Sequence, residues 1–372
     1  MAHLFFFSFY EFLLTLYINN NKERMKYKLT DETKEFKGHT LHRIECITAF
    51  SNVNVGDRGG WVECEKNLSQ FNKAWIYDNA KVYGNARVHD YATVSGNAEV
   101  YDDADVCENA EISGFVRISN HAVIRGNAKI FSSAYIRNEA VVCDNAKIYD
   151  CAEIFDFAKV CGSAEVYGYA MVYGSAEVSE NAVIRHHAKI YDDVIIKGKA
   201  RILDYATVYE HANVSGNARV YGSAKIYGIT TIYGDCHILD NAEIYERASI
   251  CGRAEVYGYA KVYGHALVCG QATVFDSALV SALVQGYARI GGNARILKNT
   301  DYSVFMNNWS SNRHFTYTRS NKMWSVGCFY GTGEALIEKA YKDSKDKGKY
   351  YEAFVKLVEQ LEQIEGTCTE GD

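Results

Sequence analysis

A six-residue repeat runs through the middle of the chain and constrains the fold more than any other feature. An aliphatic anchor, always Val or Ile, recurs at every sixth residue from Ile76 to Val274. The residue two positions after the anchor is almost always Gly, Asp, Asn or Glu. The residue two positions before it is Ala in nearly every repeat, the exceptions being Val116, Val194, Thr230 and Cys236. Repeats of this kind fix the architecture of a whole chain.

The period determines which side chains face inward. Side chains alternate between the two faces of a strand, so the Ala and the anchor point the same way. A small residue beside a β-branched one suits a narrow interior, and Gly, Asp or Asn permits the sharp bend that ends a short strand. Three such sides close a triangular coil. The sequence therefore predicts an all-β fold, a single-stranded parallel β-helix of about twelve coils stacked at strand spacing, over residues 71–297.

The absence of proline supports this prediction. The 372 residues contain none, whereas average usage is about 5%. Proline lacks the N–H that a central strand donates, so sheets confine it to edges and bulges. A chain made almost entirely of interior strands would exclude it.

The period slips once, near its end. SALV at Ser277–Val280 is followed by SALVQG at Ser281–Gly286, so one side loses two residues. The period then resumes with Ile290 and Ile296. We expect a local kink or bulge at this point.

The regions on either side of the repeat are predicted to cap it, because a solenoid exposes strand edges that would otherwise pair with another chain. Residues 25–70 predict an N-terminal β cap, with strand-like runs at Leu41–Phe50 and Trp61–Glu65. Residues 298–372 predict an α+β cap whose strands lie at Tyr302–Met306, His314–Thr318 and Met323–Tyr330.

Two helices are expected to end this C-terminal cap. Thr332 is a suitable N-cap for the first, over Glu334–Lys345, and Ser344–Lys349 reads as a loop. The second is expected near Tyr350–Ile364. Its predicted apolar face consists of Phe354, Leu357, Val358, Leu361 and Ile364.

Residues 1–24 are predicted to be a leader that does not belong to the fold, with Met25 as the true start. Leu4–Ile18 is apolar but interrupted by Glu11, and it is short for a transmembrane helix. It lacks the basic start and the cleavage site of a signal peptide. A weak interfacial anchor and a signal remain the alternatives.

The repeats resemble those of the YdcK-like solenoid proteins found in enterobacteria and in phages or prophages. The resemblance includes Gly56–Ala80, GDRGGWVECEKNLSQFNKAWIYDNA, which leads into repeats of the NARVYG type. It implies a left-handed hexapeptide β-helix of phage or prophage type. Hexapeptide acyltransferases are more loosely similar: their Gly directly follows the aliphatic residue, whereas here it comes two residues later, which leaves the handedness open.

An aromatic ladder is the strongest outward-facing signal. Residues one after the anchor point outward, and residues 18 apart stack on one side. One such column reads Phe155, Tyr173, Tyr191, Tyr209, Tyr227, Tyr245 and Tyr263. It predicts an aromatic face for a macromolecular partner, or a stack that only stabilises parallel strands; the two roles are compatible.

Cysteines form a second column. Cys143 and Cys161 lie one coil apart, as do Cys251 and Cys269, and Cys107 shares their side. The spacing is compatible with a disulfide, yet the odd total of 11 cysteines does not suggest a secreted framework. We expect reduced thiols in a bacterial cytoplasm. No second ligand type is fixed beside them by spacing, so no metal site is predicted.

Histidines argue against catalysis. Hexapeptide acyltransferases are similar in using a His base at a subunit interface, with acetyl-CoA as the acyl donor and a trimer as the assembly. Here His121, His187, His211 and His265 are dispersed at corners, and none matches a family motif. No catalytic residue and no cofactor are predicted, and acetyl-CoA enters only under the alternative acyltransferase hypothesis.

The C-terminal cap contains a smaller candidate site. Trp309, Arg313, Arg319 and Trp324 could stack bases or sugars, or could instead belong to the core of a capping sheet. The net charge of −6 gives no support for a general nucleic-acid or membrane surface. The sequence thus favours a non-enzymatic scaffold with a protein partner; an acyltransferase, and carbohydrate or nucleic-acid-related binding that includes inhibition of a host enzyme, are the alternatives.

Overall fold

The computed structural model describes residues 25–368, and the chain divides after Asp192 into two compact units. Both contain coils of the predicted solenoid. From β4 (Trp75–Ile76) to β41 (Arg295–Ile296), every strand consists of an anchor and the residue before it. With three strands to a coil, these make about thirteen coils, one more than expected.

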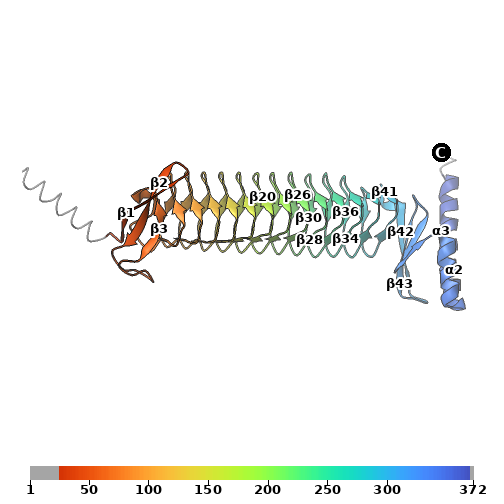
Figure 1. Ribbon diagram of the computed structural model, residues 1–372. Helices are drawn as coiled ribbons and strands as arrows, with labels where there is room; N and C mark the ends of the chain where they lie inside the picture. Colours follow the sequence, from red (N-terminus) through yellow and green to blue (C-terminus); the bar gives the residue numbers. More distant parts are fainter. Residues whose placement is uncertain (1–24, 369–372) are drawn as a thin grey trace, which may run out of the picture. The chain divides into compact units, whose positions relative to one another are not determined.

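Within each unit, each strand pairs in parallel with the strand one coil later, and the anchors lie in register. Val142 pairs with Val160, for example, and Ile148 with Val166. The neighbouring strands of successive coils are visible in Figure 1. Three sheets result, one for each side of the coil. We call them the tyrosine side, the cysteine side and the third side.

In unit 1 the three sheets have the following strands. The tyrosine side contains β5 (Lys81–Val82), β8 (Glu99–Val100), β11 (Arg117–Ile118), β14 (Tyr135–Ile136), β17 (Glu153–Ile154), β20 (Met171–Val172) and β23 (Lys189–Ile190). The cysteine side contains β6 (Arg87–Val88), β9 (Asp105–Val106), β12 (Val123–Ile124), β15 (Val141–Val142), β18 (Lys159–Val160) and β21 (Glu177–Val178). The third side contains β4, β7 (Thr93–Val94), β10 (Glu111–Ile112), β13 (Lys129–Ile130), β16 (Lys147–Ile148), β19 (Glu165–Val166) and β22 (Val183–Ile184).

Unit 2 repeats the arrangement. Its tyrosine side contains β26 (Thr207–Val208), β29 (Lys225–Ile226), β32 (Glu243–Ile244), β35 (Lys261–Val262), β38 (Leu279–Val280) and β41. Its cysteine side contains β24 (Ile195–Ile196), β27 (Asn213–Val214), β30 (Thr231–Ile232), β33 (Ser249–Ile250), β36 (Leu267–Val268) and β39 (Leu283–Val284). Its third side contains β25 (Arg201–Ile202), β28 (Arg219–Val220), β31 (His237–Ile238), β34 (Glu255–Val256), β37 (Thr273–Val274) and β40 (Arg289–Ile290).

The interior confirms the inward pattern. The anchors and the Ala residues two positions before them are almost completely buried. The residue two after the anchor takes a left-handed conformation, with φ +58° at Asp144 and +67° at Gly162. Only Gly, and less readily Asn or Asp, adopts this region at low cost. The Asp144 carboxylate also accepts a hydrogen bond of 2.9 Å from the Gly162 N–H of the next coil.

The bulge expected at the slip is wrong, and the kink expected there stays a prediction. Only Ser281 and Ala282 separate β38 from β39, so the lost residues shorten one corner. The strands beyond it still pair in parallel, Leu267 with Leu283 and Thr273 with Arg289.

The N-terminal cap of unit 1 is a small sheet. β1 (Tyr27–Phe36) and β2 (His39–Cys46) are antiparallel, β2 pairs with β3 (Arg58–Val62), and β3 adds in parallel to β5. The edge of the first coil is therefore covered. The strands differ in their bounds from the predicted runs. β2 ends at Cys46 rather than Phe50, and β3 ends at Val62, before the short helix Glu65–Asn67. The Asn67 side-chain oxygen accepts a hydrogen bond from the Cys64 N–H at the start of this helix.

The C-terminal cap of unit 2 is a four-stranded antiparallel sheet with two helices. Its strands are β42 (Tyr302–Asn307), β43 (Arg313–Thr318), β44 (Met323–Val326) and β45 (Phe329–Gly331). A short helix, Asn299–Asp301, precedes them. The single third strand predicted over Met323–Tyr330 is wrong, because Gly327 at φ +58° turns the chain back on itself.

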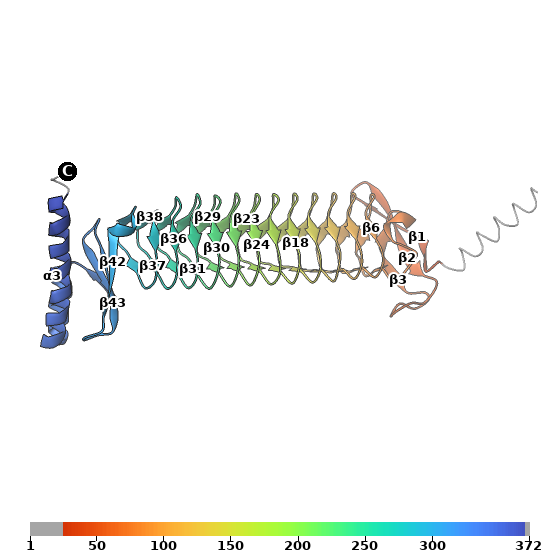
Figure 2. The ribbon, with the colours of Figure 1, turned by 180° about the vertical axis from the view of Figure 1, so that it is seen from behind.

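The two helices are α2 (Gly333–Asp343) and α3 (Lys345–Cys368). The Thr332 side chain accepts from the Ala335 N–H, as its N-cap role requires. The loop predicted over Ser344–Lys349 is reduced to Ser344. Figure 2 shows α3 on the face of the sheet that is turned away from the coils.

The predicted buried face of α3 is partly wrong. Val358 and Phe354 do pack against the sheet, together with Tyr351 and Val355. Leu357, Leu361 and Ile364 remain exposed. The face of α3 that contacts the sheet differs from the predicted one because Tyr351 packs on Phe315, with ring centroids 4.6 Å apart.

None of the helices in residues 25–368 is long and apolar enough to cross a membrane. The expectation for residues 1–24 lies outside the part of the chain that the structure describes.

Candidate binding surfaces

The aromatic column forms face-to-face stacks in both units. In unit 1, Phe155, Tyr173 and Tyr191 stack with centroids 4.7 and 4.9 Å apart. In unit 2, Tyr209, Tyr227, Tyr245 and Tyr263 stack at 4.9, 5.2 and 5.5 Å. These separations follow the spacing between adjacent strands, so the strand register itself brings the rings together.

The stacked rings are neither buried nor free. All seven are half-buried, and burial raises the pKa of the Tyr173, Tyr227 and Tyr245 hydroxyls. Each ring covers part of its neighbours and remains partly accessible to solvent. The stack therefore contributes to the stability of the sheet and still offers an aromatic surface.

The residues beside the stack carry mixed charge, as the sequence indicated. In unit 2, Lys261 pairs with Glu243 at 2.9 Å, and Lys225 occupies the same column one coil earlier. In a protein interface the rings would form the aromatic centre and these charges the polar rim. They form no uniformly basic stripe for nucleic acid.

The sequence interpretation missed a second set of aromatic stacks on the third side. Phe131, Tyr149 and Tyr167 stack at 4.8 and 4.6 Å in unit 1, and Tyr257 stacks on Phe275 at 5.6 Å in unit 2. All occupy the position one after an anchor. The same 18-residue spacing that revealed the first column would have revealed these.

The cysteine side of unit 1 holds free thiols beside carboxylates. Cys143 and Cys161 are buried and unbonded to each other. Burial raises the pKa of the Cys161 thiol to about 11. The donor atoms of Cys143, Asp144 and Cys161 lie within 4.8 Å of one another, and those of His89, Asp90 and Cys107 do likewise. A second ligand type therefore accompanies the thiols, although the expectation of no metal site stays a prediction.

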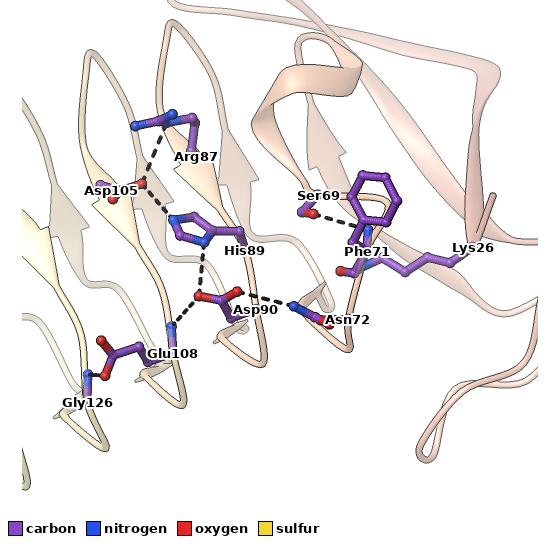
Figure 3. Close-up of polar contacts among 10 residues, drawn as sticks. All are labelled: Lys26, Ser69, Phe71, Asn72, Arg87, His89, Asp90, Asp105, Glu108 and Gly126. Carbon is purple, nitrogen blue, oxygen red and sulfur yellow. Dashed lines mark hydrogen bonds and ion pairs between the residues drawn. The ribbon is translucent and has the colours of Figure 1, made fainter. Parts of the chain in front are cut away.

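His89 is held between two carboxylates (Figure 3). Its Nε2 lies 3.1 Å from Asp105 and its Nδ1 lies 3.1 Å from Asp90, while Arg87 lies 3.6 Å from Asp105. Asp90 also accepts from the Glu108 N–H of the next coil. The network ties neighbouring coils together, and it lies outside the residues that the sequence had singled out.

The corner histidines make local contacts within their own units. His187 stacks on Tyr169 with centroids 5.1 Å apart, and His211 lies 3.4 Å from Asp193. The sequence interpretation assigned no carboxylate partner by spacing, yet Asp193 is one coil before His211. Both side chains of that pair are more than half exposed, which is a poor environment for a tuned general base.

The four candidate residues of the C-terminal cap separate into different environments. Trp324 is 2% exposed and belongs to the core under α2 and α3, whereas Trp309 is 68% exposed. The Arg319 N–H donates to the Asp301 carbonyl. Arg313 lies elsewhere, at the edge of a cleft. The structure therefore does not bring these residues together into one stacking site.

The cleft lies in unit 2, where the third side of the last coils meets the capping sheet. It has a volume of about 510 Å³ and is lined by Arg253, Glu255, Gln271, Thr273, Tyr287, Arg289, Arg313, His314 and Gly327. The rings of Tyr287 and His314, both in this lining, stack on each other with centroids 4.0 Å apart. Sequence spacing could not reveal this cleft, because it depends on where β43 packs.

Comparison with known proteins supports the predicted resemblance. Residues 212–228 match the family model described as YdcK β-solenoid repeat. A stretch of 68 residues is 37% identical to "Uncharacterized acetyltransferase YdcK" of Escherichia coli (strain K12), covering 16% of this chain and 21% of the relative. The match thus spans about a fifth of the relative's length. Residues 212–228 are therefore similar to a YdcK-type repeat, and they lie in a chain whose coils form a β-solenoid.

Proposed function

We propose that this protein is a non-enzymatic scaffold that binds a protein partner through its tyrosine side. We place it in the cytoplasm of a bacterial host and assign it a phage or prophage origin, as for the solenoid proteins that it resembles. The observation that carries the proposal is the stack from Tyr209 to Tyr263, whose rings remain only half-buried. Tyrosine supplies contact area at a low cost in conformational entropy.

The regularity of the repeat also supports this function. From β4 to β38 an anchor recurs every six residues, so no inserted loop projects from the described coils to enclose a reaction. A regular surface without projecting loops suits recognition of a partner better than catalysis.

An acetyltransferase is the second candidate, favoured by the similarity over 68 residues to a protein named as an acetyltransferase. It would act as a trimer with acetyl-CoA bound between subunits. Light scattering that shows a monomer, together with no shift of the thermal unfolding temperature by acetyl-CoA, would exclude it. A trimer that acetyl-CoA stabilises would displace the scaffold proposal.

Replacing Tyr209, Tyr227 and Tyr245 together by serine is expected to reduce recovery of the partner at least tenfold. The loss of three ring edges removes most of the proposed contact area. The measurement is affinity capture from the native host with quantitative mass spectrometry, using the full chain as bait.

The matched control is Tyr233→Ser with Tyr259→Ser, which removes exposed tyrosines from outside the stack. Thermal unfolding of both variants checks that they are folded at the temperature of capture. Equal recovery by the folded stack variant and the control would contradict a role for the tyrosine side.

A further inference from the structure

The cleft of unit 2 brings three arginines together from separate parts of the chain. Arg253 comes from the corner before β34, Arg289 from β40 and Arg313 from β43. Within the described residues, none of the three guanidinium groups has an ion-pair partner. Glu255 is the one carboxylate in the lining. Like charges repel, so three cations gathered around one hollow favour an anion that would fill it.

The position of Arg289 is fixed by its surroundings. Its backbone N–H donates to the Thr316 hydroxyl at 3.0 Å, and its guanidinium lies over the Phe275 ring at 5.5 Å. The Nε of Arg289 is buried and has no hydrogen-bond partner among the described residues. A buried N–H without an acceptor carries a desolvation cost, which an anion in the cleft would offset.

Arg313 is positioned by the turn between β44 and β45. A Cβ on Gly327 would lie 3.4 Å from an Arg313 terminal nitrogen, so the glycine leaves room for the guanidinium beside the turn. The stacked Tyr287 and His314 form the adjoining wall, and Gln271 donates to the Tyr287 hydroxyl at 3.2 Å. The cleft lining thus combines three guanidinium groups with a stacked aromatic pair.

We propose that this cleft binds a phosphorylated small molecule. Three guanidinium groups match an anion that carries at least two negative charges. The forked N–H donors of each group fit phosphate oxygens. A single carboxylate would leave the site with excess positive charge. The volume of about 510 Å³ lies in the range of small-molecule sites. The site is independent of the tyrosine side and of the proposed partner.

The test uses inorganic pyrophosphate as the probe and calorimetric titration of the full chain at low salt. We expect saturable one-to-one binding that weakens as salt is added. Arg289→Gln should weaken binding at least tenfold, and Arg253→Gln, at an exposed corner where folding is not at risk, at least threefold. Arg289→Lys should fall between the wild type and Arg289→Gln, because it keeps the charge and loses the fork.

Arg219→Gln is the matched control, since Arg219 occupies β28 on the same side of unit 2 but outside the cleft. It should leave the affinity unchanged. No saturable binding of pyrophosphate, or equal weakening by Arg219→Gln and Arg253→Gln, would overturn the site. Binding of citrate as tight as that of pyrophosphate would overturn its assignment to phosphate.

Discussion

Replacing Ile148 by alanine is expected to destabilise unit 1 by about 2–5 kcal/mol, the usual cost of truncating a buried isoleucine. Ile148 is fully buried and lies between Ile130 and Val166 of the adjacent coils. The narrow interior is closed by anchors and alanines on all three sides. Neighbouring backbones cannot move in to fill the cavity without breaking their own interstrand hydrogen bonds, so the result should lie in the upper half of this range.

Lys147→Ala is the control, because Lys147 is the other residue of β16 and points outward. Its ion pair with Glu165, at 3.0 Å, is exposed, and such pairs contribute at most about 1 kcal/mol. Urea denaturation followed by circular dichroism gives both shifts. Hydrogen exchange should show faster exchange in Ile148→Ala only for coils near β16, because each coil contacts only its neighbours. Equal midpoints for the two variants would contradict the inward orientation of the anchors.

The repeat was predictable because one periodicity determines three properties at once. The anchor and the Ala two before it define the interior, and the left-handed residue two after it defines the corner. Asp144 and Gly162 illustrate the corner, since both residue types tolerate positive φ. The register followed without further information, because a slip of one residue would turn every anchor outward.

The caps were less predictable, because their boundaries depend on tertiary contacts. Nothing local distinguishes one strand over Met323–Tyr330 from a hairpin with Gly327 at its turn. The buried stripe of α3 was displaced because Tyr351, read as a residue outside the apolar face, packs on Phe315. Amphipathic spacing identifies a helix but does not determine which of two overlapping stripes the sheet will cover.

The candidate surfaces also divide into those that the repeat predicts and those that depend on tertiary contacts. The stack of Tyr209 and its neighbours could be predicted, since it follows from the 18-residue spacing, and so could the missed stack of Tyr149 and Tyr167. The cleft could not. The repeat places Arg289 two coils after Glu255, which lies beside Arg253. Arg313 shares no spacing with them, and it reaches the cleft because β43 packs beside β40, where the Thr316 hydroxyl accepts from the Arg289 N–H.

Replacing Trp324 by alanine is expected to cost the C-terminal cap about 3–5 kcal/mol, the range for truncation of a buried tryptophan. Trp324 packs on Tyr317 and Phe315, with centroids 5.1 and 6.4 Å away, at the centre of the core formed by the sheet, α2 and α3. Its removal leaves a cavity that no flexible side chain can fill. The helices should detach at a lower temperature than the coils unfold, giving a separate early transition in calorimetry.

Trp309→Ala is the matched comparison, because Trp309 was grouped with Trp324 on sequence grounds yet is mostly exposed. Its ring contacts Phe354 with centroids 6.2 Å apart, so the expected cost is below about 1 kcal/mol, as for other exposed substitutions. If both tryptophans served a common stacking site, their replacement would weaken ligand binding together and affect stability little. A large loss of stability for Trp324→Ala alone separates the two residues, and comparable losses for both would show that the cap core extends to Trp309.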